Sequence, residues 1–418
     1  MNCKLLATIM LAVTTIFVGC TTQNNNTKNN SDTNSNALIR AGLKNKCGYI
    51  DETGNWVINP QFDWATDFAQ NGLASVKLNG KWGYIDKTGN FVVNPQFDEA
   101  DDFAENGLAR VKLNDKWGYI DKTGKMVIKP QFDYAWDFAE NELARVVLKE
   151  KCGYIDNACN WVINPQFELA CDFAENGLAL VELNGKCGYI DETGNWVINP
   201  QFDGASSFKE NGFALVELND KLGCIDKTGN WVINPQFDGD LDWEFVFAEN
   251  GLACAKLNDK WGYIDKTGTW VINPIFDDAD GFAQNGLASV KLFGKFGFID
   301  ETGNWVINLQ FDGAGSFKEN GFARAKLNGK WGYIDKNGKW VINPQFNDAY
   351  DFAENGLAFV VLNEKWGCID ETGKWIINPR YDYMLIYKNT IFIKKKRKWG
   401  IIDKNGNIVA KPQFDWVI

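Results

Sequence analysis

The sequence is dominated by a repeat of 35 residues. A lysine, followed in most copies by Trp-Gly-Tyr-Ile-Asp, recurs at this spacing except for one interval of 39 residues and a last one of 33. The eleven lysines are Lys46, Lys81, Lys116, Lys151, Lys186, Lys221, Lys260, Lys295, Lys330, Lys365 and Lys398. A fixed period of this length is typical of solenoids, propellers and other arrays of stacked supersecondary units. The repeat therefore predicts that residues 37–418 form one tandem array.

A single repeat has the pattern of a β-meander. Asn79-Gly80 lies between two runs of alternating polarity, which is typical of a two-residue type I′ hairpin. A second turn at residues 87–90 places Gly89 where a left-handed backbone is needed. We therefore expect antiparallel strands at 74–78, 81–86 and 91–94, and then a tail with room for a fourth strand. Pro95 cannot donate to a ladder, so it should end the third strand or lie at its free edge.

The expected register makes both faces of the meander apolar. With these loop lengths Val76 opposes Gly83, Tyr84 opposes Val93, and Ile85 opposes Val92. One face then has mainly aliphatic residues and the other has mainly aromatic ones: Ala74, Val76, Leu78, Ile85 and Val92 on the first, and Trp82, Tyr84, Phe91 and Val93 on the second. A sheet that is apolar on both faces needs a neighbour on each. We expect the aromatic face of each repeat to pack on the aliphatic face of the next, with Gly83 making room for a neighbour's side chain.

These observations predict the fold class. The chain should be all-β, a tandem array of eleven antiparallel meander units with three to four strands each. Propellers usually have about four to eight blades, so we favour an open, superhelical, solenoid-like stack. A closed or split β-propeller-like array is the alternative.

The repeat resembles a known family. Lys-Trp-Gly-Tyr-Ile-Asp, a Thr-Gly-Asn or Thr-Gly-Lys turn, and Trp-Val-Ile-Asn-Pro-Gln-Phe recur together through residues 40–418. This pattern is similar to that of the WG-repeat family, also called KWG repeats, found in bacterial surface and secreted proteins. The resemblance implies a repeat framework and supplies no general catalytic activity.

The N-terminal residues predict export. The apolar run from Leu5 to Val18 follows Lys4, is too short to span a bilayer and is typical of a signal-peptide core. Residues 17–20, Phe-Val-Gly-Cys, resemble the lipobox of bacterial lipoproteins, which implies a signal peptide at 1–19 and lipidation of Cys20. Residues 20–36 are mostly Asn, Thr and Ser and should form a disordered tether. We expect a lipid-anchored protein at the outer membrane or cell surface, with plain secretion or an uncleaved anchor as the alternatives.

The composition excludes several classes of function. The chain contains no histidine, so Ser-His-Asp or Cys-His catalysis and His-containing zinc sites are excluded. A net charge of −11, without a basic tract before the C-terminal region, argues against nucleic acid as a partner. The acidic residues in the repeat tails do not recur regularly enough for a ladder of calcium sites. We expect no enzyme, no catalytic residues, no cofactor and no metal, and a monomeric chain.

Two departures from the repeat are candidate sites. Repeat six has four inserted residues within 237–250, and its residues without counterparts are Asp240, Asp242, Trp243 and Glu244. Insertions in repeat arrays lie on loops, so these residues are candidates for binding a partner. They are also the place where a glycosidase would need its two carboxylates, the one enzyme class left open. The second departure is a basic cluster, a contact for anionic lipid or glycan or a cap that blunts a strand edge: Lys394, Lys395, Lys396, Arg397 and Lys398.

The repeated tryptophans and cysteines have structural interpretations. Tryptophan after the anchor lysine is replaced by Cys, Leu or Phe in other repeats, which favours packing in the core. The eight cysteines of the repeats occupy places that other residue types hold in sister repeats, so we expect free, mostly buried thiols. Cys152 and Cys187 are the pair that stacking could bring together.

These interpretations lead to an expected function. The leading hypothesis is a non-enzymatic, lipid-anchored surface scaffold that binds a protein or polysaccharide partner. The alternative is a carbohydrate-binding module, which would need a row of solvent-facing tryptophans or tyrosines in successive repeats.

Overall fold

The computed structural model describes residues 38–239, 247–353, 355–387 and 390–417. These residues divide into two compact parts. The N-terminal part contains residues up to Asp51 together with Asn55–Pro235, and the C-terminal part contains the described residues from Gln236 onward together with Glu52–Gly54. In the described ranges no helix has the length and hydrophobicity that crossing a bilayer would require.

All regular elements in the described ranges are β-strands, and they form eleven small antiparallel sheets. The strands of the N-terminal part, grouped by sheet, are β1 Ile39–Leu43, β2 Lys46–Ile50, β3 Trp56–Phe62; β4 Trp64–Ala65, β5 Ala74–Leu78, β6 Lys81–Ile85, β7 Phe91–Phe97; β8 Glu99–Ala100, β9 Leu108–Leu113, β10 Lys116–Asp121, β11 Met126–Phe132; β12 Tyr134–Phe138, β13 Ala144–Leu148, β14 Lys151–Ile155, β15 Trp161–Phe167; β16 Leu169–Ala170, β17 Ala179–Leu183, β18 Lys186–Ile190, β19 Trp196–Phe202; and β20 Gly204–Ala205, β21 Ala214–Leu218, β22 Lys221–Ile225, β23 Trp231–Phe237.

The C-terminal part continues the same pattern. Its strands are β24 Ala253–Leu257, β25 Lys260–Ile264, β26 Trp270–Phe276; β27 Asp278–Ala279, β28 Ala288–Leu292, β29 Lys295–Ile299, β30 Trp305–Phe311; β31 Gly313–Ala314, β32 Ala323–Leu327, β33 Lys330–Ile334, β34 Trp340–Phe346; β35 Asp348–Ala349, β36 Leu357–Leu362, β37 Lys365–Asp370, β38 Trp375–Tyr381; β39 Tyr383–Tyr387, β40 Thr390–Lys395, β41 Lys398–Ile402, β42 Ile408–Phe414; and β43 Trp416–Val417. The prediction of an all-β tandem array of small antiparallel meanders is confirmed.

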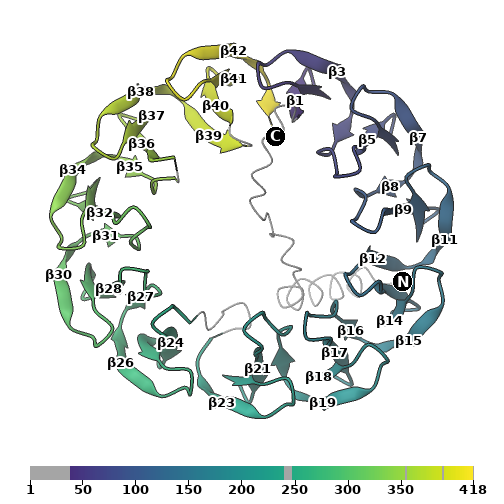
Figure 1. Cartoon of the computed structure of the whole chain (residues 1–418), viewed down its shortest axis with the longest axis horizontal. Helices are drawn as coiled ribbons and strands as arrows, with labels where there is room; N and C mark the ends of the chain where they lie inside the picture. Colours follow the sequence, from purple (N-terminus) through teal and green to yellow (C-terminus); the bar gives the residue numbers. More distant parts are fainter. Residues whose placement is uncertain (1–37, 240–246, 354, 388–389, 418) are drawn as a thin grey trace, which may run out of the picture. The chain divides into compact units, whose positions relative to one another are not determined.

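Nine of the eleven sheets join two successive repeats; the sheets with β1–β3 and β24–β26 are the exceptions. In the sheet β4–β7 the strands are paired in chain order, and the short strand β4 comes from the tail of the preceding repeat. The tail therefore does form a fourth strand, but this strand pairs forward with the next repeat. Within each part, the sheets follow one another in chain order along an arc, with the long third strands such as β7 and β30 on its convex side (Figure 1).

The ladder between β6 and β7 has two register shifts, and the register of the sheet β4–β7 differs from the prediction at one of them, a bulge between Tyr84 and Ile85. Val76 pairs with Gly83 and Tyr84 pairs with Val93, as expected. Ile85, however, pairs with Phe91, and the prediction that it opposes Val92 is wrong. The bulge turns the side chain of Val92 outward, where 42% of its surface is exposed.

The third strand also explains the repeated glycine. β7 continues through Pro95 as the edge strand of its sheet, so this proline lies at a free edge, one of the two predicted places. A Cβ atom on Gly83 would lie 2.4 Å from the carbonyl oxygen of Val93 and 2.6 Å from the nitrogen of Pro95. Gly83 is therefore required by the backbone of its own sheet. The prediction that it makes room for a side chain of the neighbouring repeat is wrong.

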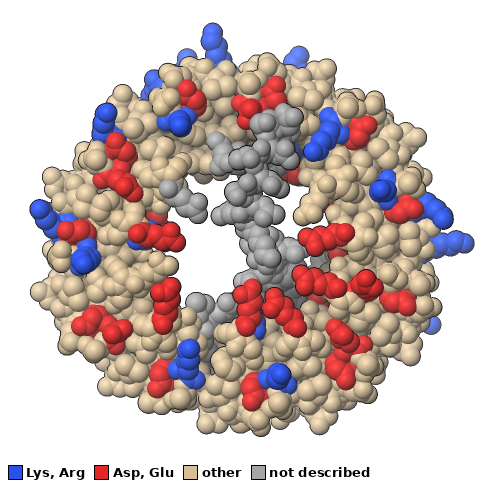
Figure 2. Space-filling view, viewed as in Figure 1, with Lys and Arg blue, Asp and Glu red and all other residues tan. Residues whose placement is uncertain are grey.

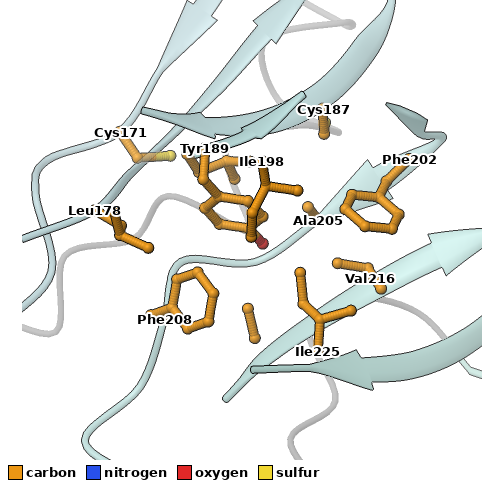
Figure 3. Close-up of a cluster of buried hydrophobic side chains, with 12 residues drawn as sticks. Cys171, Leu178, Cys187, Tyr189, Ile198, Phe202, Ala205, Phe208, Val216 and Ile225 are labelled. Atoms are coloured by element: carbon orange, nitrogen blue, oxygen red, sulfur yellow. The ribbon is translucent and has the colours of Figure 1, made fainter. Parts of the chain in front are cut away.

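The core lies between successive sheets, as predicted. The aromatic face of the sheet β4–β7 packs on the aliphatic face of the next sheet, with Tyr84, Val93 and Phe97 against Ala109, Val111 and Ile120. Figure 3 shows the same arrangement later in the N-terminal part, where Tyr189 and Phe202 lie against Val216 and Ile225. Burial of these side chains stabilises the stack through the hydrophobic effect. Both predicted architectures, the open solenoid-like stack and the propeller-like array, have this face-to-face packing of sheets within each part.

The anchor lysine also helps to connect each sheet to the next one. Nζ of Lys81 lies 2.5 Å from Oδ1 of Asp98, and Oδ2 of Asp98 accepts a hydrogen bond from the backbone N–H of Asn114 in the first hairpin of the next sheet. The aspartate thus connects the lysine of one sheet to a turn of the following sheet. This link recurs in most repeats, and it gives the acidic tail residues a structural role.

Candidate functional site

Some of the sequence-based candidates cannot be placed. Cys20, the predicted lipidation site, lies outside the described residues. So do Asp240, Asp242, Trp243 and Glu244, the candidate binding residues of the repeat-six insertion. Their roles remain predictions.

The basic cluster lies on the hairpin between β40 and β41. Lys396 and Arg397 form the turn, with positive φ values of 52° and 66°. β40 is hydrogen-bonded to β39 on one side and to β41 on the other, so Lys394 and Lys395 are not on an edge strand. The explanation that these lysines blunt a strand edge is therefore wrong.

The five basic residues do not form one free patch. Lys398 occupies the anchor position and is paired with Asp415. Nζ of Lys394 lies over the ring of Trp399, 5.4 Å from its centre. The remaining three, Lys395, Lys396 and Arg397, are exposed at the hairpin and are the ones left to contact an anionic group.

The repeated tryptophans are held between sheets. Trp161, at the start of β15, packs edge-to-face on Phe132 of the preceding sheet with the ring centres 5.9 Å apart, and 36% of its surface is exposed. The same contact recurs between Phe202 and Trp231. Trp117, after its anchor lysine, is only 4% exposed. These rings therefore take part in the packing between sheets, as predicted, but Trp161, Trp231 and Trp305 keep 36%, 38% and 38% of their surface exposed at equivalent positions.

Exposed aromatic rings gather instead at one place in the C-terminal part, here named the Tyr350 patch. Its members are Tyr350, Phe359, Trp366, Tyr383 and Trp399. Tyr350 stacks on Trp366 with an interplanar angle of 28° and ring centres 5.1 Å apart, and Tyr383 lies 4.5 Å from Trp366 on a tilted plane. Tyr383 also contacts Trp399 at 5.9 Å. The two tyrosines are 41% and 43% exposed, whereas Phe359, Trp366 and Trp399 are half-buried.

Local structure fixes the two exposed tyrosines. The backbone N–H of Tyr350 donates to the carbonyl oxygen of Phe359 at 3.0 Å. The carbonyl of Tyr350 accepts the hydroxyl of Tyr333 at 2.6 Å. Tyr383 is the first residue of β39 and pairs with Lys394. Both tyrosine side chains therefore project from backbone that is held by hydrogen bonds.

Charged groups surround the aromatic rings. Nζ of Lys365 lies 2.6 Å from Oδ1 of Asp382, next to Tyr383 in sequence. The pKa of Tyr350 is raised by burial and, secondarily, by the carboxylate of Asp348. Its hydroxyl is therefore neutral near pH 7 and can both donate and accept hydrogen bonds. The patch combines apolar ring faces with polar groups at its margin.

A smaller aromatic group lies in the N-terminal part. Tyr134 contacts Trp117 at 5.6 Å and Trp136 at 4.4 Å between ring centres. The guanidinium of Arg145 lies 3.8 Å from the ring centre of Trp136 and covers it. Tyr134, with 42% of its surface exposed, is the one member that offers a largely open ring.

Sequence reasoning missed both aromatic groups. Tyr134 and Tyr383 occupy the first position of the short tail strand, where other repeats have Glu99, Asp278 or Gly313. Trp64, Leu169 and Trp416 also hold this position, so an aromatic residue there was only a weak signal. It was hidden because the repeat already contains many aromatic residues.

Two aspartates of the tail segments, Asp101 and Asp137, form ion pairs with one arginine. Oδ2 of Asp101 and Oδ1 of Asp137 lie 2.8 Å and 3.0 Å from the guanidinium of Arg110. Burial raises the pKa of both carboxyls. A guanidinium between two carboxylates is typical of a structural ion pair. Among the residues that the structure describes, no cluster of three or more Cys, Asp or Glu side chains is arranged to hold a metal ion.

Most repeat cysteines are free thiols. Cys152 and Cys187, the pair that stacking could have joined, are both free and buried. The other free thiols in the described ranges are Cys47, Cys159, Cys224, Cys254 and Cys368. For Cys171 the prediction is wrong, since this residue is disulfide-bonded.

Comparison with known proteins identifies the repeat. A family model described as "WG containing repeat" matches residues 48–82, 82–117, 117–152, 153–187, 188–221, 223–261, 261–295, 296–331, 331–366, 366–399 and 399–418. No curated protein matches the sequence.

Solved structures give only distant likenesses. The extracellular domain of a one-component system from B. thetaiotaomicron is 9% identical, with a TM-score of 0.29 over 90% of this chain and 70% of that one. A eukaryotic initiation factor is also 9% identical, with a TM-score of 0.36 over 81% of this chain and 95% of that one. At these scores neither likeness bears on function.

Proposed function

Because this chain belongs to the WG-repeat family, we propose that it is a non-enzymatic scaffold whose stacked sheets present a binding surface to a protein or polysaccharide partner. The observation that supports this function is the Tyr350 patch. Most tyrosines of the repeats are buried between sheets, whereas Tyr350 and Tyr383 are 41% and 43% exposed and both contact a third ring, that of Trp366. Trp64 and Tyr134 are also exposed, at 55% and 42%. Exposed aromatic groups of this kind are typical of recognition surfaces.

The proposal includes the location of the protein. The signal-peptide pattern and Cys20 support export and lipid anchoring, and the Asn-rich tether would hold the sheets away from the membrane. Metabolic labelling with a radioactive fatty acid in a bacterial host tests this part. The full chain should incorporate label and the Cys20→Ser variant should not. Equal labelling of both would contradict lipidation at Cys20.

A binding measurement tests the scaffold function. Residues 37–418, without signal and lipid, would be incubated with arrays of purified polysaccharides and extracellular proteins. We expect saturable binding to at least one immobilised partner, and no cleavage of that partner during incubation. The double variant Tyr350→Ala/Tyr383→Ala should lose that binding while keeping its melting temperature. Absence of binding on both arrays, or hydrolysis of a bound glycan, would contradict the proposal.

A carbohydrate-binding module is the second candidate, in a modified form. Its original basis, a row of equivalent solvent-facing tryptophans, is met only in part, because Trp161, Trp231 and Trp305 are 36–38% exposed and each packs edge-to-face on a phenylalanine of the preceding sheet. The Tyr350 patch nevertheless offers exposed rings at positions outside the regular repeat. This observation favours a single localised glycan site over a ladder of identical ones.

A further inference from the structure

We propose that the Tyr350 patch is a glycan-binding subsite that stacks pyranose units with flat C–H faces, such as β-linked glucose or N-acetylglucosamine. This inference rests on the proposed scaffold function and names its ligand class. The rings of Tyr350 and Tyr383 both contact that of Trp366, with ring centres 5.1 Å and 4.5 Å from it. Together with Trp399, which Tyr383 contacts at 5.9 Å, they form one connected group of aromatic rings.

The chemistry of the rings suits a sugar face. An aromatic face is electron-rich and attracts groups with partial positive charge. The C–H bonds on the flat side of a pyranose are weakly positive and apolar, so they pack on such a face. Tyr350 and Tyr383 each have a large exposed surface, and their hydroxyl groups supply polar ends that water or a sugar hydroxyl can contact.

The patch is organised before any ligand arrives. The backbone of Tyr350 is fixed by Phe359 on its N–H and by Tyr333 on its carbonyl oxygen. Tyr383 is fixed by its strand pairing with Lys394. Little backbone entropy would therefore be lost when a sugar binds to these two side chains, and preorganisation of this kind favours affinity.

Polar groups at the margin match the hydroxyls of a sugar. The pair formed by Lys365 and Asp382 is partly exposed, with side-chain exposures of 48% and 38%. Its carboxylate can accept hydrogen bonds from hydroxyl groups and its ammonium can donate them. A binding site with an apolar surface and a few placed polar groups is the usual arrangement for small ligands.

The patch is less suited to a large protein or a nucleic acid. A standard protein interface buries about 800 Å² and 20–30 residues on each partner, whereas only two rings of the Tyr350 patch are exposed and the charged residues Lys365, Asp382 and Lys394 lie next to its members in the sequence or in the strand pairing. The net charge of −11 opposes a polyanion. On the face shown in Figure 2, acidic side chains recur throughout both parts and no extended basic area is visible.

The N-terminal aromatic group provides an internal control. Tyr134 is as exposed as Tyr350, but its neighbour Trp117 is buried and its neighbour Trp136 is covered by Arg145. It therefore offers one open ring where the Tyr350 patch offers two. A single ring should not hold a glycan at measurable strength, so Tyr134→Ala should leave glycan binding unchanged.

The experiment is a titration of residues 37–418 with hexasaccharides of β-1,4-linked glucose and of β-1,4-linked N-acetylglucosamine, followed by calorimetry and tryptophan fluorescence. We expect at least one hexasaccharide to bind and to change the fluorescence, because Trp366 lies against both tyrosines. Loss of a stacked aromatic ring typically weakens binding by about tenfold. Tyr350→Ala and Tyr383→Ala should each show a loss of this size, and melting temperatures would confirm that both variants are folded.

The outcomes separate this inference from the scaffold function. Equal affinity in wild type and in both tyrosine variants would overturn the inference even if a glycan binds elsewhere. An equal loss in Tyr134→Ala would also overturn it. If neither hexasaccharide binds but an array protein binds through Tyr350 and Tyr383, the glycan inference fails and the scaffold function stands. If no glycan and no protein binds at all, both fail.

Discussion

The hydroxyl of Tyr84 donates a hydrogen bond to the backbone carbonyl oxygen of Asp101, 2.6 Å away in the next sheet. The same bond joins Tyr189 to Ser206 and Tyr333 to Tyr350, always 17 residues apart. The tyrosine of the Trp-Gly-Tyr motif therefore fastens each sheet to the tail segment that follows it. In the Tyr350 patch this structural bond also positions an exposed ring, so framework and candidate site are connected there.

Removal of this hydroxyl should destabilise the stack. Tyr84→Phe deletes the donor and leaves the carbonyl of Asp101 without it, so we expect a loss of about 1 kcal/mol in the free energy of unfolding. Phe298, which occupies the equivalent place in a later repeat, is a matched control. Phe298→Tyr restores the hydroxyl and should not destabilise. Urea unfolding followed by fluorescence measures both, and an unchanged midpoint for Tyr84→Phe would contradict the assigned role.

The glycine of the same motif should tolerate no side chain. In Gly83→Ala the new Cβ would meet backbone atoms of Val93 and Pro95 at 2.4 Å and 2.6 Å. Backbone cannot move aside as a side chain can, so we expect a loss of about 1–3 kcal/mol or more. Gly80→Asp is the control. The hairpin position of Gly80 is open and Asp115 occupies its equivalent at φ 61°, so the cost there should stay below about 1 kcal/mol. Thermal unfolding would distinguish them, and equal costs would contradict the backbone explanation.

Much of the fold could be predicted because the repeat contains strong local signals. Asn79-Gly80 determines the first hairpin, and loop length then determines that Val76 opposes Gly83. The bulge could not be predicted in this way, because counting residues from a turn assumes a regular ladder. Gly83 and Pro95, on facing strands whose backbones approach each other closely, mark the other register shift, between Trp82 and Tyr84, and gave no signal for this bulge.

The remaining differences depend on contacts between repeats. β8 has only two residues, Glu99 and Ala100, so it has no periodicity from which its forward pairing could be predicted. The Tyr350 patch joins Tyr350, Trp366 and Tyr383 across successive sheets. None of these residues stands out in the sequence by itself, because only the stacking of the sheets brings their rings together. The sequence therefore predicts the repeated core better than it predicts where the array departs from it.

The ion pairs between sheets should make stability depend on acid pH. A hydrogen bond from Lys81 is the main cause that lowers the pKa of Asp98 below 3.8, and the same shift recurs at Asp203 and Asp312 with their own lysines. A carboxyl with a lowered pKa in the folded state contributes stability above its unfolded pKa and loses it as pH falls through the folded one. We therefore expect a nearly constant melting temperature from about pH 5 to 8 and a fall below about pH 4.

Buried carboxyls change the stability in the opposite direction as pH falls. An asparagine that replaces the aspartate in another repeat suggests a variant that separates the two effects. Burial raises the pKa of Asp101, so its penalty on the folded state is relieved as pH falls. For the ion pair, Asp98→Asn imitates Asn347, whose side-chain oxygen accepts the N–H of Asn363 at 2.9 Å without an ion pair. This variant should fold, should melt near the wild-type temperature at pH 7, and should lose less stability between pH 5 and pH 3. If the melting temperature of this variant fell between pH 5 and pH 3 by as much as that of the wild type, the role of Asp98 would be contradicted.

The free thiols should differ sharply in reactivity. Burial raises the pKa of Cys187 and of Cys224 to about 12. At pH 8 each of these two thiols is therefore ionised in only about one molecule in ten thousand. Cys159 replaces the glycine of a turn and is only partly buried, with its Sγ 3.4 Å from Nε2 of Gln131. Iodoacetamide at pH 8, followed by mass spectrometry, should therefore label Cys159 first. Cys187 should react only after urea is added, because unfolding restores both access and an ordinary pKa. Comparable labelling of Cys187 and Cys159 in the native protein would mean that the joint between these sheets opens readily.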